Sequence, residues 1–324
     1  WTTIATSKDP DEHGIRGFAH SSKDGKPGRL YSNQEREAKA FWNVLTSSDR
    51  RVATVGWWVT YPVEPVNGVM VAQVNTATRA GIKKGTAIMK GGLVEGLDGQ
   101  VHPPERHDEI FREVAAAEAD LPAFTASLID GAPEDLGPLE MRLWREVQWA
   151  FRADTAYERI ALHLLATDEP YDVFAVYLGG TDVVGHNFWR HAYPGRYHHP
   201  PAPEQLALVG DLLHRYYDYA DDVIGRLVAV APADATVIVV SDHGMVTHNQ
   251  ASTFPADGVP RDVKSGWHDK APAGVFVAAG PSIRPPTDSR APERLTRSDL
   301  GTVASIYDIV PTLLALAGVP VGRD

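Results

Sequence analysis

Short, predominantly apolar runs alternate with longer amphipathic segments along most of the chain. Apolar runs of strand length occur at residues 51–56, 171–178, 236–240 and 274–279. Longer segments with helical spacing occupy residues 140–167 and 203–230, each just before one of these runs. Apolar strands that are separated by helices are typical of a parallel sheet buried on both faces. The pattern therefore predicts an α/β fold with a doubly wound, mostly parallel sheet and helices on both of its faces.

Local signals predict further elements near the two ends of the chain. Ser32 followed by Glu35 forms a capping-box pattern, which predicts a helix over residues 36–45. Residues 306–317 have an apolar helical face and are followed by Gly318, so they predict a closing helix. Residues 79–138 contain Gly/Lys turns, a helix near 109–119 and no recognisable chemistry. We interpret them as an inserted, cap-like region within one catalytic domain that covers residues 1–324.

Composition narrows the classes of function. The chain has 31 Lys and Arg against 42 Asp and Glu, a formal net charge of −11. An extended nucleic-acid surface needs clustered positive charge and is not expected here. The chain contains no cysteine, which excludes disulfides, cysteine-ligated zinc and a cysteine nucleophile within these residues. No apolar run approaches the roughly 20 residues of a membrane-spanning helix, so no membrane span is expected.

Residues that can ligate a metal stand beside three of the predicted strands. They are two carboxylates and three imidazoles, namely Asp182, His186, Asp242, His243 and His268. In open α/β sheets, ligands bind outside the carboxyl ends of the strands, so we expect Asp182 and Asp242 to converge there. Oxygen and imidazole donors suit zinc, with manganese or iron as alternatives.

Each motif taken alone admits a structural explanation. Asp182 could cap a helix, and His268 could be an ordinary surface histidine. The ordered combination beside core strands is more specific than any one member. Two divalent metal ions about 3.5–4 Å apart can clamp the attacking and leaving oxygens of an in-line displacement at phosphorus. The ligand set therefore predicts a metal-dependent hydrolase.

The same segments resemble a known family. The strand-Asp-His-Gly-Met signature of the type I phosphodiesterase/nucleotide pyrophosphatase family, in the alkaline phosphatase superfamily, is matched by VIVVSDHGM. Its D-x-x-G-H motif is matched by TDVVGH, and its late histidine strand by GWHDKAPAGVFVAAGPSI. Its closing helix is similar to SIYDIVPTLLALAGVP, and the segment downstream of its nucleophile to WTTIATSKDPDEHGI. The similarity extends from residue 1 to about residue 320.

This resemblance implies a role for each predicted ligand. Asp182, His186 and His268 would hold one metal ion, with zinc favoured. Asp242 and His243 would hold the other. The resemblance also favours a periplasmic or extracellular location.

The resemblance further implies a Ser or Thr nucleophile that is activated by metal and forms a covalent intermediate. When the chain is aligned on His13-Gly14-Ile15, this nucleophile is expected a few residues upstream of Trp1. A further aspartate ligand and the first core strand are expected upstream of Trp1 as well. Thr2, Thr3, Thr6 and Ser7 fall after the nucleophile position.

A few residues are candidate substrate contacts. Trp57 and Trp58 follow a strand and could stack on a substrate, although core packing explains such residues equally well. His191 and Lys270 could meet a phosphate oxygen, against the simpler interpretation of surface side chains. Phe18 stands where nucleotide pyrophosphatases place an asparagine shortly after His-Gly-Ile, and this leaves the ester class open.

We therefore predict a metal-dependent hydrolase of small phosphoric esters, with phosphodiester or pyrophosphate bonds favoured. A sulfatase, a phosphomonoesterase or a phosphonate hydrolase would use the same scaffold with a different pocket. A homologue that binds a ligand without turnover is the alternative from another class. The complete set of visible ligands argues against it. The exact substrate and the oligomeric state are not determined by the sequence.

Overall fold

The computed structural model describes residues 1–20, 29–77, 89–251, 264–283 and 304–322. Within these ranges the α-helices are α1 (Thr2–Thr6), α2 (Pro10–His13), α3 (Phe41–Ser47), α5 (His107–Ser127), α6 (Pro138–Thr167), α7 (Gly180–Ala192), α8 (Pro203–Val209), α9 (Leu212–Val230) and α11 (Ile309–Leu316). The strands are β1 (Val52–Trp57), β2 (Gly68–Ala72), β3 (Thr76–Ala77), β4 (Met89–Lys90), β5 (Val101–His102), β6 (Val173–Val176), β7 (Val237–Val240), β8 (Val246–Thr247), β9 (Gly266–Trp267) and β10 (Phe276–Ala279). None of the described helices combines the length and apolarity needed to cross a membrane.

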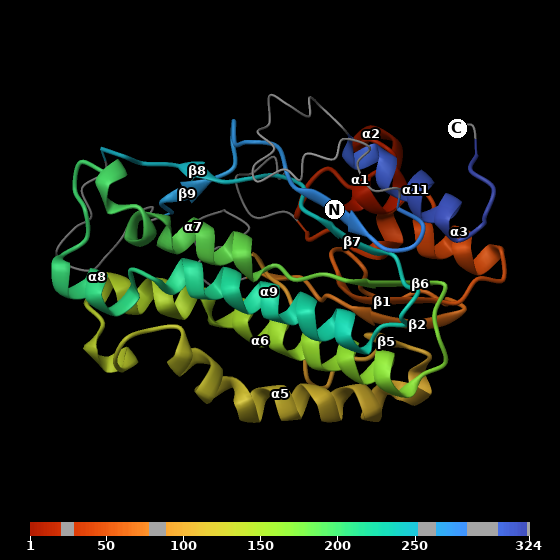
Figure 1. Cartoon of the computed structure of the whole chain (residues 1–324), viewed down its shortest axis with the longest axis horizontal. Coiled ribbons are helices and arrows are strands. Elements are labelled where there is room, and N and C mark those ends of the chain that lie inside the picture. Colours follow the sequence, from red (N-terminus) through yellow and green to blue (C-terminus); the bar gives the residue numbers. More distant parts are fainter. Residues whose placement is uncertain (21–28, 78–88, 252–263, 284–303, 323–324) are drawn as a thin grey trace.

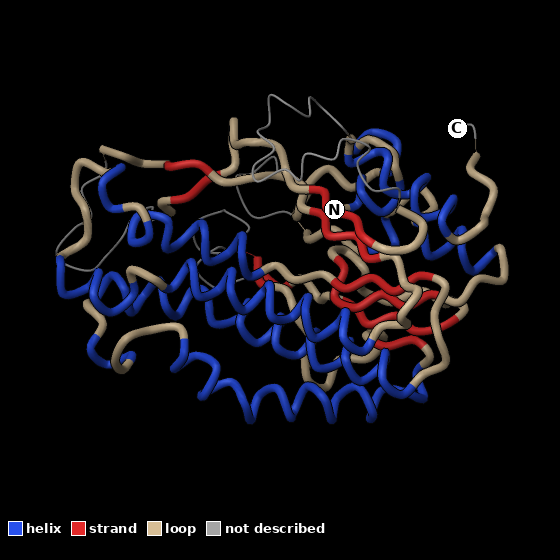
Figure 2. Tube along the Cα trace, viewed as in Figure 1, coloured by secondary structure: helices blue, strands red, loops and turns tan. Residues whose placement is uncertain are grey.

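The central sheet has the strand order β5-β2-β1-β6, and its middle is parallel. In Figure 2 the strands are drawn in red, with helices in blue around them. β1 pairs in parallel with β2 and with β6, so that Val52 lies opposite both Gly68 and Val173. The α/β class with parallel strands is confirmed. β10, in contrast, pairs antiparallel with β7 in a separate two-stranded sheet. The described residues between them contain β8 and β9 and no helix, whereas a parallel pair requires a crossover connection.

Helices lie on both faces of the central sheet because apolar side chains alternate between its two sides. On one side, Val52 and Met70 pack against α1, α3 and α11 in a cluster that includes Phe41. On the other side, Val55 and Val71 pack against α5 and α6. In Figure 1, α3 and α11 stand on one side of the sheet, and α6 and α5 on the other.

The position of α7 follows from a further apolar cluster. Val184 and Phe188, both fully buried, project from one face of α7 against α6 and α9. Among their neighbours are Phe151 of α6 and Tyr216 of α9. α7 therefore has one face in the core, and β9 lies along it on another side.

Two sequence predictions about helices are corrected. Ser32 and Glu35 do form the capping box, but it closes a single 3-10 turn, and the helix begins only at Phe41. The chain is extended at Arg36 (φ −75°, ψ 118°), whose buried guanidinium donates to Glu64 and Asn43. A tertiary ion pair thus outweighs local helix propensity. The helix expected over residues 203–230 is interrupted between α8 and α9.

Only part of the predicted insert at 79–138 can be compared with the structure, because residues 79–88 lie outside the described residues. The helix expected near 109–119 is the longer α5, which continues through Pro122. α5 lies lengthwise against α6 as an outer layer (Figure 1).

Gly56 offers a direct test of the close packing at the end of β1. Its φ is +73°, and an added Cβ would lie 2.5 Å from the Cδ2 atom of the buried Tyr157. Gly56→Ala is therefore expected to lower the free energy of unfolding by about 2–3 kcal/mol. At Gly225, in an exposed part of α9 with no atom within 4 Å of the added Cβ, the same substitution should raise it by about 0.5–1 kcal/mol. Urea denaturation measures both, and effects of equal sign would contradict this account.

Candidate metal centre

The predicted ligands come from three segments that meet beside α7. Asp182 and His186 stand at positions i and i+4 of α7 and therefore share one face of the helix. Asp242 and His243 follow β7 after the single residue Ser241, and His268 directly follows β9. Because β9 packs on α7, residues far apart in the sequence are brought together.

Three of these side chains form a compact group. The donor atoms of Asp182, His186 and His268 all lie within 4.8 Å of one another. Asp182 Oδ1 is 3.5 Å from His186 Nε2. Ligand atoms around a tetrahedral zinc are separated by about 3.3 Å, given metal–ligand bonds of roughly 2.0–2.1 Å. The group is therefore somewhat wider than a coordination shell, and small side-chain movements would bring its donor atoms to bonding distance.

His186 is held in the form that a metal requires. Its Nδ1–H donates to the Gly266 carbonyl oxygen at 2.8 Å, which leaves the Nε2 lone pair facing Asp182. Burial lowers the pKa of His186 to about 4, and the Asp182 carboxylate opposes this shift. The ring is consequently neutral at pH 7 and presents an acceptor atom to the cluster.

Asp182 supplies an independent sign that the group fits a cation. Its Oδ1 atom is buried and has no hydrogen-bond partner among the described residues. Two imidazole nitrogens face this oxygen, His186 Nε2 at 3.5 Å and His243 Nε2 at 4.0 Å. A buried carboxylate oxygen without a partner is costly. A cation bound at this oxygen would compensate that cost.

The second predicted pair adjoins the first group. His243 Nε2 lies 3.6 Å from Asp242 Oδ1, and the ring centroids of His243 and His268 are 4.3 Å apart. The Nδ1–H of His243 donates to the Gly244 carbonyl oxygen at 3.0 Å. The five predicted ligands are therefore contiguous, and Asp182 Oδ1 lies between His186 and His243.

The contact between β9 and α7 depends on small residues that sequence reasoning missed. A Cβ on Gly266 would lie 2.3 Å from the Gly185 carbonyl oxygen, so only glycine allows this approach. The buried Ser265 donates its N–H to the His186 carbonyl at 2.8 Å, and its Oγ accepts from the Arg190 N–H at 3.1 Å. The only signal in the sequence was a serine and a glycine directly before Trp-His.

The two predicted tryptophan contacts occupy different environments. Trp57 is 6% exposed and belongs to the core cluster that contains Trp42, so it does not lie open to a substrate. Trp58 is partly exposed and stands between Phe18 and Tyr177, with ring-centroid distances of 5.1 and 6.1 Å. Trp58 therefore remains the better placed of the pair.

His191 and Lys270 also differ in their environments, because His191 is buried and Lys270 is exposed. His191 is 2% exposed, its ring packs near Phe188, and its Nε2 lies 3.2 Å from Glu140 Oε1. It is enclosed by protein and does not face the cluster of predicted ligands. Lys270 is exposed, two residues after His268, and has a φ of +60°.

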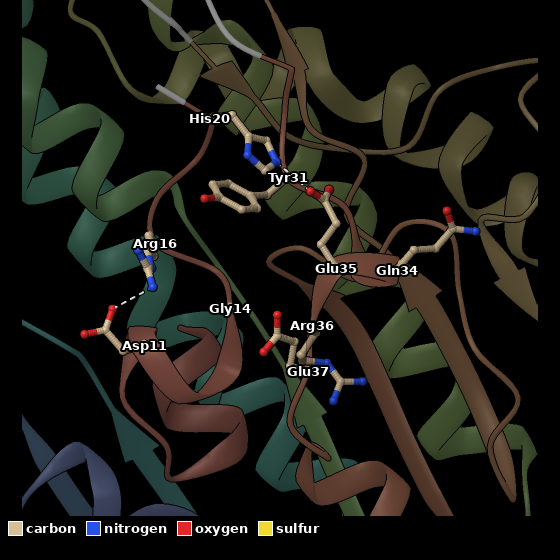
Figure 3. Close-up of a pocket in the computed structure, with 9 residues that line it drawn as sticks. All are labelled: Asp11, Gly14, Arg16, His20, Tyr31, Gln34, Glu35, Arg36 and Glu37. Atoms are coloured by element: carbon tan, nitrogen blue, oxygen red, sulfur yellow. Dashed lines mark hydrogen bonds and ion pairs between the residues drawn. The ribbon is translucent and has the colours of Figure 1, made fainter. Parts of the chain in front are cut away.

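A cavity of about 480 Å³ lies apart from these ligands and contains none of them (Figure 3). Among its lining residues are Asp11, Arg16, His20, Tyr31, Glu35 and Glu37. Arg16 pairs with Asp11 at 3.0 Å, and His20 contacts Glu35 at 2.5 Å. Arg16 and Asp11 of this wall therefore neutralise each other.

The depressed pKa of His186 predicts a pH dependence of stability. Between pH 6.5 and about 4, the unfolded chain binds a proton at His186 that the metal-free folded chain does not. The free energy of unfolding should therefore fall by about 1.4 kcal/mol per pH unit from this residue as the pH decreases. Asp182→Asn removes a charge that favours the imidazolium and should lower the pKa of His186 further. Titration of the His186 ring by ¹⁵N NMR measures its pKa in the wild-type protein and in Asp182→Asn, and urea unfolding at several pH values measures the change in stability. A wild-type midpoint at or above 6.5 would disprove the assignment.

Comparison with known families agrees with this geometry. The sequence profile described as type I phosphodiesterase / nucleotide pyrophosphatase matches residues 1–299, which include all five predicted ligands. No curated protein matches the chain. Because the matched region covers most of its length, the chain belongs to the type I phosphodiesterase/nucleotide pyrophosphatase family, a family of phosphodiesterase- and pyrophosphatase-type hydrolases within the alkaline phosphatase superfamily.

Proposed function

We propose that this protein hydrolyses small phosphodiesters or pyrophosphates with two divalent metal ions, zinc being favoured over manganese or iron. The observation that carries the proposal is the group formed by Asp182, His186 and His268. In this group a buried carboxylate oxygen without a hydrogen-bond partner faces imidazole nitrogens. The family match supplies the reaction class.

In this proposal Asp182, His186 and His268 hold one ion, and Asp242 and His243 contribute to the other. When bound, the ions would supply Lewis acidity at the phosphoryl oxygens and lower the pKa of the attacking hydroxyl. The chain's own contribution is to keep the ligands deprotonated and oriented. Burial keeps His186 neutral, and two backbone carbonyls hold the Nδ1–H groups of His186 and His243.

We place the nucleophile upstream of Trp1, as the family resemblance implies. The Trp1 nitrogen supports this location, because it is buried close to the centre. The Asp242 carboxylate lies close enough to this nitrogen to interact with it electrostatically. The Trp1 ring packs edge-on against Trp57 and Tyr177, with centroid distances of 5.5 and 4.6 Å. A residue that precedes Trp1 would consequently start beside Asp242.

Two of the hydroxyls that follow Trp1 are engaged elsewhere. Thr3 Oγ1 lies 3.1 Å from His13 Nε2, and the Thr6 hydroxyl donates to the Thr2 carbonyl at 2.8 Å.

We further propose that a strand preceding Trp1 completes a doubly wound sheet within a single catalytic domain. β6 is the edge strand of the central sheet, and β7 pairs with β10 alone among the described strands. The residues of β6 and β7 are apolar but only partly buried. A strand placed between β6 and β7 would cover both edges.

Metal binding can be tested on this chain directly. Addition of Zn²⁺ to chelator-treated protein is expected to raise the free energy of unfolding, by about 2.7 kcal/mol when free zinc reaches 100 times its dissociation constant. His268→Ala should remove most of this stabilisation, because it deletes one of three clustered donors. His214→Ala, on the exposed side of α9, is the matched control and should retain it. Equal zinc responses of the two variants in thermal unfolding would contradict the ligand assignment.

Activity requires a chain that includes the residues preceding Trp1. With zinc present, it is expected to hydrolyse a nitrophenyl phosphodiester and a nucleotide-like diester faster than a nitrophenyl monoester or sulfate. A chelator should abolish turnover, and Asp242→Ala should lower kcat/KM by about 100-fold or more.

Each alternative predicts a different result in the same assay. A preference for the sulfate or the monoester would replace the proposed substrate class by that of a sulfatase or a phosphomonoesterase. Bound zinc without turnover of any of the four esters would favour a ligand-binding homologue.

A further inference from the structure

Asp154 is a buried carboxylate that the proposed metal ligands do not explain. It lies within α6, is 2% exposed, and forms no ion pair among the described residues. An isolated buried carboxylate costs several kcal/mol unless hydrogen bonds compensate it. Its hydrogen-bond partners therefore indicate its role.

All three of these partners lie at or beside the start of α7. Oδ1 accepts the Gly179 N–H at 3.0 Å, and Oδ2 accepts the Gly180 N–H at 2.8 Å. The Tyr216 hydroxyl of α9 donates to Oδ2 at 2.8 Å. Gly179 is the N-cap residue of α7 and has no side chain to cap it. Asp154 thus supplies, from another helix, an acceptor for two N–H groups at the start of α7 that have no partner within the helix.

The backbone at this turn is closely packed. A Cβ on Gly180 would lie 1.9 Å from the Tyr216 hydroxyl oxygen, and one on Gly179 would lie 3.0 Å from the Tyr177 ring. Tyr216 is fully buried and stacks on Phe151 with ring centroids 5.4 Å apart. The two glycines are therefore matched in size to the groups that hold them.

We propose that Asp154 is a positioning residue for the metal centre. It fixes the turn at Gly179 and Gly180, and Asp182 follows within the first turn of α7. The direction of the Asp182 carboxylate, and of His186 one turn later, is set by where α7 begins. This inference rests on the proposed role of Asp182 and His186 as metal ligands.

The charge state of Asp154 determines how it can be probed. Burial raises its pKa to about 6, and the hydrogen bonds from Tyr216, Gly180 and Gly179 oppose this shift. At pH 8 the group is therefore an acceptor-only carboxylate that serves all three donors. An amide of the same shape has one oxygen, and its NH₂ group would face a backbone N–H. Asp154→Asn thus disrupts the turn with little change of volume.

Glu158 provides a matched control. It lies on the same helix, and its carboxylate also accepts from a tyrosine of α9, Tyr219, at 2.9 Å. It accepts from Arg226 at 2.7 Å as well, and none of its partners belongs to the turn before α7. Glu158→Gln should weaken helix packing without displacing the predicted ligands.

The experiment measures zinc affinity by competition with a chromophoric chelator and the visible absorption spectrum of the Co²⁺-substituted protein, both at pH 8. Urea unfolding of the metal-free proteins is measured in parallel. Asp154→Asn is expected to weaken zinc binding by about 10- to 100-fold and to change the Co²⁺ spectrum. Glu158→Gln should lose stability but keep its zinc affinity within about 2-fold and its spectrum unchanged. Tyr216→Phe retains both backbone hydrogen bonds. It should also weaken zinc binding, but by a factor several times smaller than that for Asp154→Asn.

Wild-type zinc affinity and an unchanged spectrum in Asp154→Asn would overturn the positioning role and leave the proposed function intact. If Asp154→Asn does not fold, the Tyr216→Phe variant is used to test the positioning role. A weakened affinity with an altered spectrum supports the role, and wild-type values overturn it. If the wild-type chain itself binds no zinc, the proposed function fails and this inference fails with it.

Discussion

The burial of one face of α7 is the constraint on which the candidate site depends. Val184 and Phe188 are fully buried against α6 and α9. Asp182 precedes Val184 by two residues, a rotation of roughly 200° around the helix, and His186 precedes Phe188 by the same interval. Packing of the apolar pair therefore directs Asp182 and His186 away from the core. The hydrophobic effect, which has no direction of its own, thereby sets the direction of two polar side chains.

The site that results is arranged at a cost to stability. Asp182 Oδ1 is buried without a hydrogen-bond partner among the described residues, and burial keeps His186 neutral. Backbone groups offset part of this cost, because the Gly266 carbonyl accepts from His186 and Asp154 satisfies the first amides of α7. Unpaired polar groups that persist in this way are characteristic of sites that bind a ligand.

Sequence reasoning succeeded where one local pattern dominates. The apolar strands and the helix α6 lie close to where the hydrophobic pattern predicts them, because burial of an apolar face outweighs competing local signals. It failed where a tertiary contact prevails over local propensity. Arg36 was expected in a helix but has an extended backbone and forms an ion pair with Glu64. Trp57 and His191 were candidate substrate contacts but are buried.

The sequence by itself determined the α/β class, the order of the main elements and the five ligand-type residues. These depend on periodicity and on residue chemistry, which can be recognised along the chain. Only the tertiary structure decided that β10 runs antiparallel to β7 and that Gly266 lies against Gly185. It also decided that Asp154 reaches the start of α7 from a different helix. Such contacts depend on distances between atoms that are remote in sequence, and no periodicity in the chain encodes those distances.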